Sequence, residues 1–245
     1  MNNVLVVIPT YNEIQNISLI INSIFSLHNK INILVIDDNS PDGTSNKVKE
    51  LKNIYKSNLH LITRKNKFGL GSAYIFAFKW AIKKDYEYII SMDADLSHDP
   101  KEIPKLLNPV KKGYDFSVGS RYIDGINVVN WPLKRILLSR MAAIYVRLIT
   151  WMNIKDPTSG FVCYKSYALK KINIDNINSN GYAFQIETKF KLFSKRFKYA
   201  EVPIVFTDRK FGKSKLDSSI IGEAFIRVIL IKLQSFFKLN KWKEF

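Results

Sequence analysis

The amino-acid sequence predicts an α/β fold in which helices cover both faces of a mostly parallel sheet, with amphipathic helices toward the C-terminus. Short β-branched runs alternate with segments of helical periodicity along most of the chain. Polar clusters follow these runs, and sites in such sheets lie outside the carboxyl ends of the strands. At 245 residues and 47% hydrophobic content, the chain is long and apolar enough for one large core.

The first half of the chain carries several predicted strands. They cover residues 4–8, 31–36, 59–63, 88–92 and 115–119. Apolar residues at helical spacing follow the first strand between residues 17 and 25. Further helices are predicted to end near residue 82 and to lie near residues 103–110. This alternation predicts parallel strands joined by crossover helices.

The second half of the chain continues the pattern less regularly. We expect a helix at 133–151, a strand at 161–164, a loop and helix at 181–193, a strand at 199–206 and a helix at 220–239. The sequence contains no internal repeat, low-complexity tract or clear linker. We therefore expect one domain over residues 1–217, followed by a basic amphipathic helix and tail over residues 218–245.

The apolar run at residues 88–92 leads into a loop with two aspartates, Asp93 and Asp95. Residues at this spacing point to one side of an extended chain, so the two carboxylates can converge on one ligand. Close carboxylates repel unless a cation or proton lies between them, and hard oxygen ligands suit Mg²⁺ or Mn²⁺. Alone, the pair also fits a solvated turn. Its place at a strand end favours a metal–diphosphate site.

Asp37 and Asp38 follow the second strand, where a carboxylate can accept hydrogen bonds from a ribose or a base. The same segment also fits a turn with a helix cap at Thr44. The sequence has no G-x-G-x-x-G after its first strand and no Walker-type phosphate loop, so neither a dinucleotide fingerprint nor a P-loop is indicated. We expect His98 to be a loop residue.

The formal net charge of +17 implies an anionic partner, such as a phosphate-bearing substrate, an acidic membrane surface or a nucleic acid. Nucleic acid is disfavoured, because the basic residues form no recognised binding module and the four aspartates above would repel a phosphate backbone. The single cysteine, Cys163, excludes an internal disulfide and fits a reducing compartment. No stretch approaches the ~20 apolar residues of a membrane span, and the first apolar run is too short for a signal peptide.

Several motifs stand together in this sequence. They are Val-Ile-Pro-Thr-Tyr-Asn-Glu (7–13), Asp-Asp-Asn-Ser-Pro-Asp-Gly-Thr (37–44), Met-Asp-Ala-Asp-Leu-Ser-His (92–98), Gly-Ser-Arg (119–121), Asn-Trp-Pro-Leu-Lys-Arg (130–135), Asp-Pro-Thr-Ser-Gly-Phe (156–161) and Arg-Lys-Phe-Gly-Lys-Ser-Lys (209–215). This set resembles the dolichol-phosphate (polyprenol-phosphate) mannose synthases, which are inverting family 2 glycosyltransferases of the GT-A fold. The resemblance covers about residues 4–217, which would then form the catalytic domain.

The resemblance implies transfer of mannose from GDP-mannose to a polyprenyl or dolichyl phosphate. It implies a nucleotide-sugar site at Pro9, Tyr11, Glu13, Ile36, Asp38, Asp93, Ala94, Asp95, Arg121, Arg209 and Lys215. It further implies Mg²⁺ or Mn²⁺ at Asp93 and Asp95, and the lipid phosphate at Arg135 and Ser139. Some members ligate the metal through a Gln two residues after the second aspartate. Here that position is Ser97, whose hydroxyl is a poorer ligand.

The expected chemistry places the catalytic work on Asp95, Arg121 and Arg135. A metal at Asp95 would stabilise the departing diphosphate, and Arg121 could bind the same charge. The lipid phosphate is already mostly ionised near pH 7, so it needs positioning by Arg135 more than a general base. A UDP-glucose-dependent transferase and, less so, a nucleic-acid-binding protein remain alternatives. A sugar nucleotidyltransferase shares the topology, but the Gly-rich, Arg-bearing loop with which it usually begins is absent here.

The helix at residues 220–239 carries large apolar side chains interrupted by Arg227, Lys232 and Lys238. These charges disfavour spanning, whereas an interfacial helix can lie on a membrane with its basic residues at the headgroups. Docking on the catalytic domain is the alternative for this helix, and the helix at 133–151 is a second candidate for the membrane surface. We therefore expect peripheral binding at the cytoplasmic face of a membrane, with a membrane-anchoring partner subunit as a further possibility.

Overall fold

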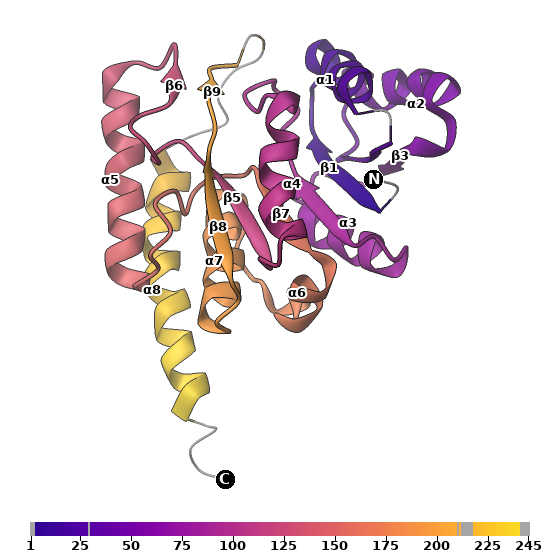
Figure 1. Cartoon of the computed structure of the whole chain (residues 1–245). Coiled ribbons are helices and arrows are strands. Elements are labelled where there is room, and N and C mark those ends of the chain that lie inside the picture. The colour runs from indigo at the N-terminus through magenta and orange to yellow at the C-terminus, as the bar shows by residue number, and fades with distance from the viewer. Residues whose placement is uncertain (1–2, 29, 210, 212–217, 241–245) are drawn as a thin grey trace.

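The computed structural model describes residues 3–28, 30–209, 211 and 218–240. Within these residues, a main sheet of seven strands has the order β3-β2-β1-β4-β7-β5-β8, and β6 pairs with β9 in a second small sheet (Figure 1). The strands are β1 (Val4–Thr10), β2 (Asn32–Asp37), β3 (Leu59–Thr63), β4 (Tyr88–Ser91), β5 (Phe116–Ser120), β6 (Val128–Val129), β7 (Val162–Lys165), β8 (Tyr199–Pro203) and β9 (Phe206–Thr207).

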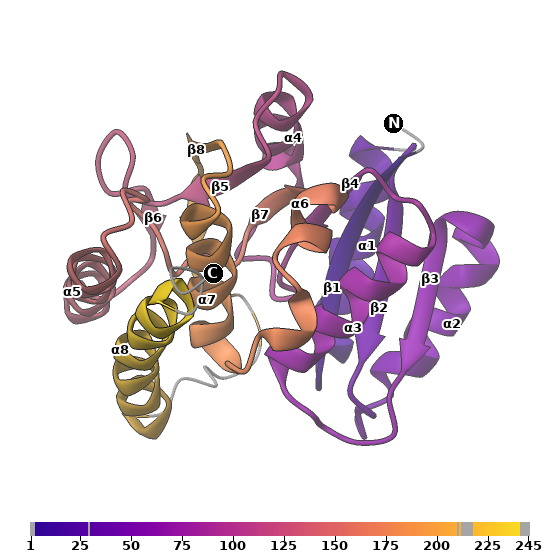
Figure 2. The same cartoon turned by 90° about the horizontal axis from the view of Figure 1, so that it is seen from below.

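Helices connect most of these strands and cover both faces of the main sheet (Figure 2). They are α1 (Ile14–Leu27), α2 (Thr44–Tyr55), α3 (Leu70–Lys83), α4 (Ile103–Lys111), α5 (Leu133–Thr150), α6 (Ser166–Lys171), α7 (Gly181–Ser194) and α8 (Ser218–Asn240), with short 3-10 turns at Lys56–Asn58, Pro100–Glu102 and Ile174–Asn176.

The core is divided by the sheet, because successive strand residues point to opposite faces. Along β1, Leu5 and Val7 belong to the core beneath α3, α6 and α7. Val6 and Ile8 belong to the core beneath α1, α2 and α4. Strands buried on both sides in this way read as continuous apolar runs, which explains why the sequence pattern identified them.

All strands of the main sheet run parallel except β7, which lies antiparallel between β4 and β5. The start of β7 therefore lies beside the ends of its two neighbours. The Ser91 hydroxyl at the end of β4 donates to the carbonyl oxygen of Gly160, just before β7, at 2.7 Å. The loop that precedes β7 thus reaches the edge of the sheet where the parallel strands end.

The predicted α/β class and mostly parallel sheet are confirmed, with local differences. The last predicted strand divides in two: β8 ends at Pro203, whose nitrogen has no hydrogen to continue the ladder, and β9 begins at Phe206. The segment between β2 and α2 is a turn, as its alternative interpretation expected, but the expected cap at Thr44 is wrong: Thr44 is the first residue of α2, and Gly43 takes the N-cap position with a φ of 90°.

The C-terminal helix α8 lies beside α5 and packs on α7 (Figures 1 and 2). Its Val228 and Ile231 are buried in the core that α7 shares. The ring of Tyr145 on α5 packs at a tilt against that of Phe225, with 4.3 Å between ring centres, and Lys232 lies over the ring of Trp151 at 3.7 Å. The described part of the C-terminal helix is therefore packed against the domain.

Candidate active site

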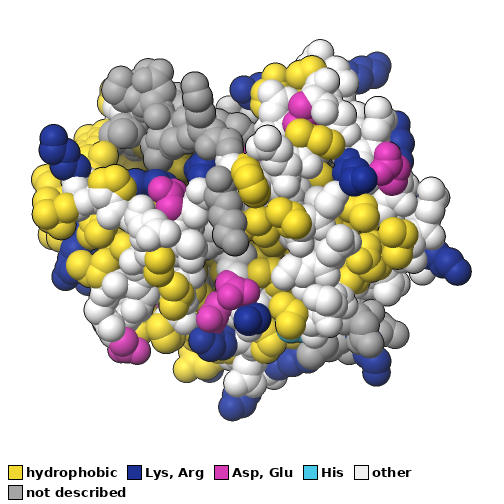
Figure 3. Space-filling model, turned by 90° about the horizontal axis from the view of Figure 1, so that it is seen from above, with side chains coloured by type: hydrophobic (Ala, Val, Ile, Leu, Met, Phe, Trp, Pro, Cys, Tyr) yellow, Lys and Arg dark blue, Asp and Glu magenta, His cyan; other side chains and the backbone are white. Residues whose placement is uncertain are grey.

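A cavity of about 420 Å³ opens at the carboxyl ends of β1, β2 and β4. Its lining comes from both halves of the chain: Pro9, Thr10, Tyr11, Glu13, Asp38, Lys67, Gly69, Leu70, Ala73, Asp93, Ala94, Asp95, Thr158, Gly160, Asn180, Gly181, Tyr182, Ala183, Gln185, Arg209 and Ala224. Figure 3 views the molecule from this end, where acidic and basic side chains lie side by side on the surface. The polar loops that follow separate strands thus meet at one edge of the sheet.

The loop after β4 carries Asp93 and Asp95 to the cavity, and hydrogen bonds within the loop fix its shape. The Ser97 amide donates to Oδ1 of Asp95 at 3.1 Å, and the Asp93 amide donates to Nδ1 of His98 at 3.1 Å. The His98 ring is buried and lies against two aromatic rings. As expected, His98 is a loop residue, and its role is to hold the aspartate loop.

The two carboxylates stand close enough to disturb each other. Burial raises the pKa of Asp93, and the charge of Asp95 raises it further, while His98 and Arg209 act in the opposite direction. The Asp93 side chain is nevertheless 39% exposed, so it remains open to a ligand. The Arg209 guanidinium lies 3.4 Å from Oδ2 of Asp95. A divalent cation between the carboxylates would relieve their repulsion.

The donor set fits a hard divalent cation that shares its ligands with a substrate. Asp93 and Asp95 supply carboxylate oxygens, and among the described residues no group of three or more His, Cys, Asp and Glu side chains is arranged to enclose a metal. Such a cation takes its remaining ligands from water or phosphate oxygens, as Mg²⁺ commonly does. Ser97 is buried and does not line the cavity, which leaves it unsuited to this role.

The predicted donor-site residues of β1 and its loop line the opposite wall. Pro9, Tyr11 and Glu13 all reach the cavity, and Nζ of Lys67 lies 4.3 Å from the centre of the Tyr11 ring. A planar ring beside a cation at the end of β1 can contact a base or a ribose phosphate. The sequence motifs had not indicated a role for Lys67.

Asp38 also lines this wall, but its carboxylate already has partners. It forms a buried ion pair with Arg64 and accepts hydrogen bonds from the amides of Phe68 and Gly69 at 3.2 and 3.3 Å. Asp38 therefore fixes the loop after β3 against the cavity. Ile36, expected at the nucleoside, has no exposed surface and lies in the core, because its position in β2 points its side chain under α3.

Arg121 is committed to a buried carboxylate. Its Nε and one terminal nitrogen each lie 2.7 Å from an oxygen of Asp156, and the same terminal nitrogen donates to the Thr158 hydroxyl at 2.8 Å. Burial alone would raise the pKa of Asp156, but the Arg121 guanidinium outweighs it and holds that pKa below its ordinary value. Arg121 does not line the cavity, so the structure gives it the role of holding the loop before β7.

Arg135 and Ser139 lie near the start of α5, outside the cavity. The Arg135 guanidinium lies 2.9 Å from Oδ1 of Asp208 and 4.1 Å from the centre of a Trp131 ring. The Ser139 hydroxyl accepts a hydrogen bond from Tyr122 at 2.6 Å. Asp208, the partner of Arg135, directly precedes Arg209, which lies beside Asp95. The segment after β9 therefore contacts both the α5 residues and the aspartate pair.

The structure thus brings most of the predicted site residues together. Those that line the cavity are Pro9, Tyr11, Glu13, Asp38, Asp93, Ala94, Asp95 and Arg209. Those with described side chains outside it are Ile36, Arg121, Arg135 and Ser139. Lys215 lies outside the residues that the structure describes.

Sequence reasoning gave no role to Thr158, Gly160, Asn180, Tyr182 and Gln185, which also line the cavity. The first two lie in the loop before β7, and the others lie at the start of α7. They reach the cavity because β7 is antiparallel and because the N-terminal turn of α7 faces the same edge. Thr158 and Gly160 belong to the Asp-Pro-Thr-Ser-Gly-Phe motif (156–161), which contributed to the family resemblance without giving either residue a role. The segment before α7 showed only turn-forming residues, which do not by themselves point to a site.

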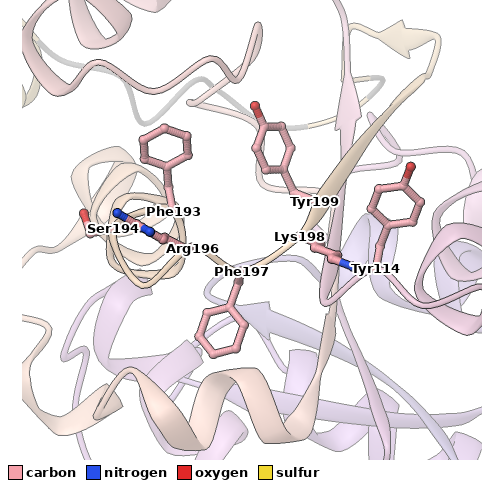
Figure 4. Close-up of a pocket in the computed structure, with 7 residues that line it drawn as sticks. All are labelled: Tyr114, Phe193, Ser194, Arg196, Phe197, Lys198 and Tyr199. Carbon is pink, nitrogen blue, oxygen red and sulfur yellow. The ribbon is translucent and has the colours of Figure 1, made fainter.

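A larger, shallower hollow of about 560 Å³ lies elsewhere, at the start of β8 (Figure 4). Its lining residues are Tyr114, Phe193, Ser194, Arg196, Phe197, Lys198 and Tyr199. It lies at the amino ends of β5 and β8 and is lined by no carboxylate, so it offers nothing that would bind a metal–diphosphate group. We therefore assign the candidate active site to the smaller cavity at the carboxyl ends of the strands.

A family model described as Glycosyl transferase family 2 matches residues 5–173. The chain belongs to glycosyl transferase family 2. It is therefore a glycosyltransferase, and the polar cavity at the carboxyl ends of its strands is the candidate site of that activity. The family resemblance read from the sequence motifs is confirmed.

Among its relatives, the chain is 41% identical over 224 residues to polyprenol monophosphomannose synthase of Mycolicibacterium smegmatis, covering 91% of this chain and 84% of the relative. It is 37% identical to undecaprenyl-phosphate mannosyltransferase of Micrococcus luteus, covering 92% of each chain. It is also 37% identical to dolichol-phosphate mannosyltransferase of Pyrococcus furiosus, covering 97% of this chain and 64% of that protein.

Solved structures support the fold. The chain resembles glucosyl-3-phosphoglycerate synthase of Mycobacterium tuberculosis, crystallised with Mn²⁺, UDP and glucosyl-3-phosphoglycerate, with a TM-score of 0.67. The match covers 94% of this chain and 78% of the synthase, at 18% sequence identity. This likeness places the family 2 chain in the GT-A-like fold class.

Proposed function

We propose that this glycosyltransferase transfers mannose from GDP-mannose to a polyprenyl phosphate of the dolichyl type, with inversion at the anomeric carbon. One observation carries the proposal: of the three relatives at 37–41% identity, two are named as mannosyltransferases of a polyprenyl-type phosphate and one as a synthase of polyprenol monophosphomannose. The cavity supports it, because an acidic pair and a basic side chain meet there, as a nucleotide-diphosphate sugar requires.

The donor would lie across the cavity from the ends of β2 and β1 toward the end of β4. Its nucleoside would lie toward Tyr11 and Lys67, beside β1 and β2, and its diphosphate at the aspartate pair after β4. Mg²⁺ or Mn²⁺ would be held by Asp93 and Asp95, and when bound it supplies positive charge to the departing diphosphate. Arg209, already beside Asp95, adds a second positive charge at the same place.

The acceptor side is supplied by Arg135 and Ser139. A lipid phosphate oxygen is mostly ionised near pH 7, so the enzyme needs to hold it near the anomeric carbon and does not need to deprotonate it. Arg135 is only 27% exposed at its side chain and is held by Asp208 and an indole ring, which fixes its direction before a phosphate arrives. A doubly charged phosphate would compete with Asp208 for the guanidinium.

The lipid chain of the acceptor requires an apolar surface, and α5 presents one. Leu133, Leu137, Met141, Ile144, Leu148 and Trp151 follow one stripe along this helix and are all exposed. The neighbouring α8 exposes Ile226, Ile229, Leu230 and Leu233. No helix in the described ranges is long and apolar enough to cross a bilayer. We propose that this two-helix face lies on the cytoplasmic surface of a membrane, with nearby basic side chains at the headgroups.

Flotation with anionic vesicles at low salt tests the membrane proposal. The purified chain should float with the vesicles, and the Leu137→Ser, Leu148→Ser double variant should float much less. A Leu19→Ser, Ile54→Ser variant is the matched control, because those exposed apolar residues lie on α1 and α2. Failure of the unaltered chain to float would refute autonomous binding and favour a membrane-anchoring partner subunit on the same face.

Turnover assays test the catalytic proposal. Purified protein is incubated with Mg²⁺ or Mn²⁺, a short polyprenyl phosphate and each of GDP-mannose, UDP-glucose and other nucleotide sugars. GDP-mannose should be the preferred donor, and NMR of the product should show inverted configuration at the anomeric carbon. Preference for UDP-glucose would replace the sugar assignment with the glucosyltransferase alternative, and retention of configuration would overturn the inverting mechanism.

A further inference from the structure

Gln185 is a buried polar side chain with no hydrogen-bond partner among the residues that the structure describes. It lies on the first turns of α7, is 3% exposed and lines the candidate cavity. Within the described ranges, both its amide oxygen and its amide nitrogen lack a hydrogen-bond partner. Buried amides are nearly always satisfied, because leaving one without partners costs free energy.

The surroundings place this amide beside the reacting end of the donor. A Cβ atom built on Gly160 would lie 3.6 Å from Asp93 Oδ2 and 3.7 Å from Gln185 Nε2, so these two polar groups flank the gap that Gly160 leaves open. Across the sheet, β2 and β1 come before β4, and β7 follows it. A nucleotide that begins at β2 and β1 and places its diphosphate at Asp93 therefore directs its sugar toward Gly160 and Gln185.

The wall that carries Gln185 is built rigidly. Nζ of the fully buried Lys189 donates to the carbonyl oxygen of Gln185 at 3.1 Å and to that of Ser159 at 2.7 Å. One ammonium group thus joins the turn of α7 that bears Gln185 to the loop that bears Gly160. A side chain that distinguishes substrates by the positions of their hydroxyl groups must itself be held in a fixed position.

We infer that the Gln185 amide hydrogen-bonds hydroxyl groups of the transferred sugar and so selects the donor. An amide offers one donor and one acceptor group side by side, which matches two neighbouring hydroxyls of a hexose. This inference rests on the proposed function, since it requires a nucleotide-sugar donor. A ribose also has neighbouring hydroxyls, and the experiment separates the two.

The test compares the unaltered chain with Gln185→Leu, which keeps the size of the side chain and removes its hydrogen-bonding atoms. Gln15→Leu is the matched control, because Gln15 is exposed on α1. With GDP-mannose and Mn²⁺, kcat/KM of Gln185→Leu should fall about tenfold to a hundredfold, as expected for two hydrogen bonds. Calorimetric binding of GDP with Mn²⁺ should change less than about twofold, because GDP carries the ribose without the mannose.

Deoxy and deoxyfluoro analogues of the donor sugar provide the second arm. At least one such change should weaken kcat/KM of the unaltered chain and leave Gln185→Leu no worse, which identifies the hydroxyl that the amide contacts. Gln185→Leu should also be at least as stable to urea as the unaltered chain, because the apolar side chain removes an unsatisfied buried amide.

Four outcomes decide the inference. Unchanged kcat/KM in Gln185→Leu, an equal loss of GDP affinity, or deoxy effects of the same size in both proteins would each overturn it. Marked destabilisation of Gln185→Leu would point to a structural amide and overturn it as well. If the unaltered chain turns over no nucleotide sugar, the proposed function fails first, and that failure is seen before any variant is compared.

Discussion

Replacing Lys189 with methionine should remove a pH-dependent cost to the stability of the folded protein. Lys189 has no exposed surface, and burial lowers its pKa to about 7, against the opposing attraction of Asp156. Its two hydrogen bonds go to backbone carbonyls and not to a carboxylate. At low pH the folded state therefore holds a full positive charge in its interior, with no direct counter-ion in the part of the chain that the structure describes.

The sign of the effect follows from proton binding. In the unfolded chain a lysine has a pKa near 10.4, so between pH 7 and that value the unfolded state binds more protons than the folded state. Stability must therefore rise with pH in this window. The cost of the buried charge is complete below pH 7 and disappears as the pH approaches 10.4. The free energy of unfolding should rise by roughly 2 to 3 kcal/mol between pH 7 and pH 9 from this group alone.

Urea denaturation from pH 6.5 to 9 measures this change. At each pH, the free energy of unfolding of Lys189→Met is subtracted from that of the unaltered chain, so that titrations common to both cancel. The difference should increase with pH for Lys189→Met and stay flat for the exposed control Lys195→Met. A difference for Lys189→Met that varies by less than about 0.5 kcal/mol across this range would refute the reasoning.

Other substitutions probe the site and its support. Asp95→Asn should lower kcat at least about a hundredfold and weaken Mn²⁺ binding in calorimetry, because it removes a charge from the proposed metal site. Arg135→Ala should raise the apparent KM for polyprenyl phosphate about tenfold or more, with GDP-mannose affinity unchanged in calorimetry. Asp156→Ala should lower the free energy of unfolding in urea by about 3 to 5 kcal/mol, because the buried Arg121 loses its counter-ion.

Each of these substitutions has a control or an opposing result. Full activity in excess EDTA, or a normal rate for Asp95→Asn, would exclude the metal role. Loss of GDP-mannose affinity in Arg135→Ala, equal to the loss on the lipid side, would move that residue to the donor. Asp175→Ala removes an exposed ion pair with Lys79 and should cost less than about 1 kcal/mol. Asp156→Ala must be clearly less stable than this control.

The aspartate pair and most of the donor wall could be predicted from the sequence, because they depend on local pattern. An apolar run followed by Asp93 and Asp95 specifies a strand and its loop, and parallel strands bring their ends together. The turn after β2 could also be predicted: Asp42 accepts hydrogen bonds from the hydroxyl and the amide of Thr44, the first residue of α2, at 2.6 and 3.0 Å.

The remaining features depend on which distant residues meet. From the sequence alone, Arg121 was expected to bind phosphate. In the structure the antiparallel β7 places Asp156, 35 residues away, beside it, and the two side chains pair. Lys189 lies in a helix where a lysine would ordinarily be placed on the surface, and only the packing of α7 encloses it. Gln185 had no sequence signal of its own, because an unsatisfied amide is recognised only when its surroundings are known.

The direction of β7 has a consequence for how this enzyme could acquire new acceptors. Between the end of β5 at Ser120 and the start of β7 at Val162, the chain leaves the sheet, builds α5 and returns to the same edge. Both ends of this excursion are anchored, because Arg121 near one end and Asp156 near the other form a buried ion pair. The excursion is therefore tied at its base, and the β6–β9 pair and the Arg135–Asp208 ion pair also hold it to the chain after β8. The length of the rest of the excursion can change without moving the strands of the main sheet. Evolution could therefore exchange the part proposed to face the lipid while the donor site stays in place.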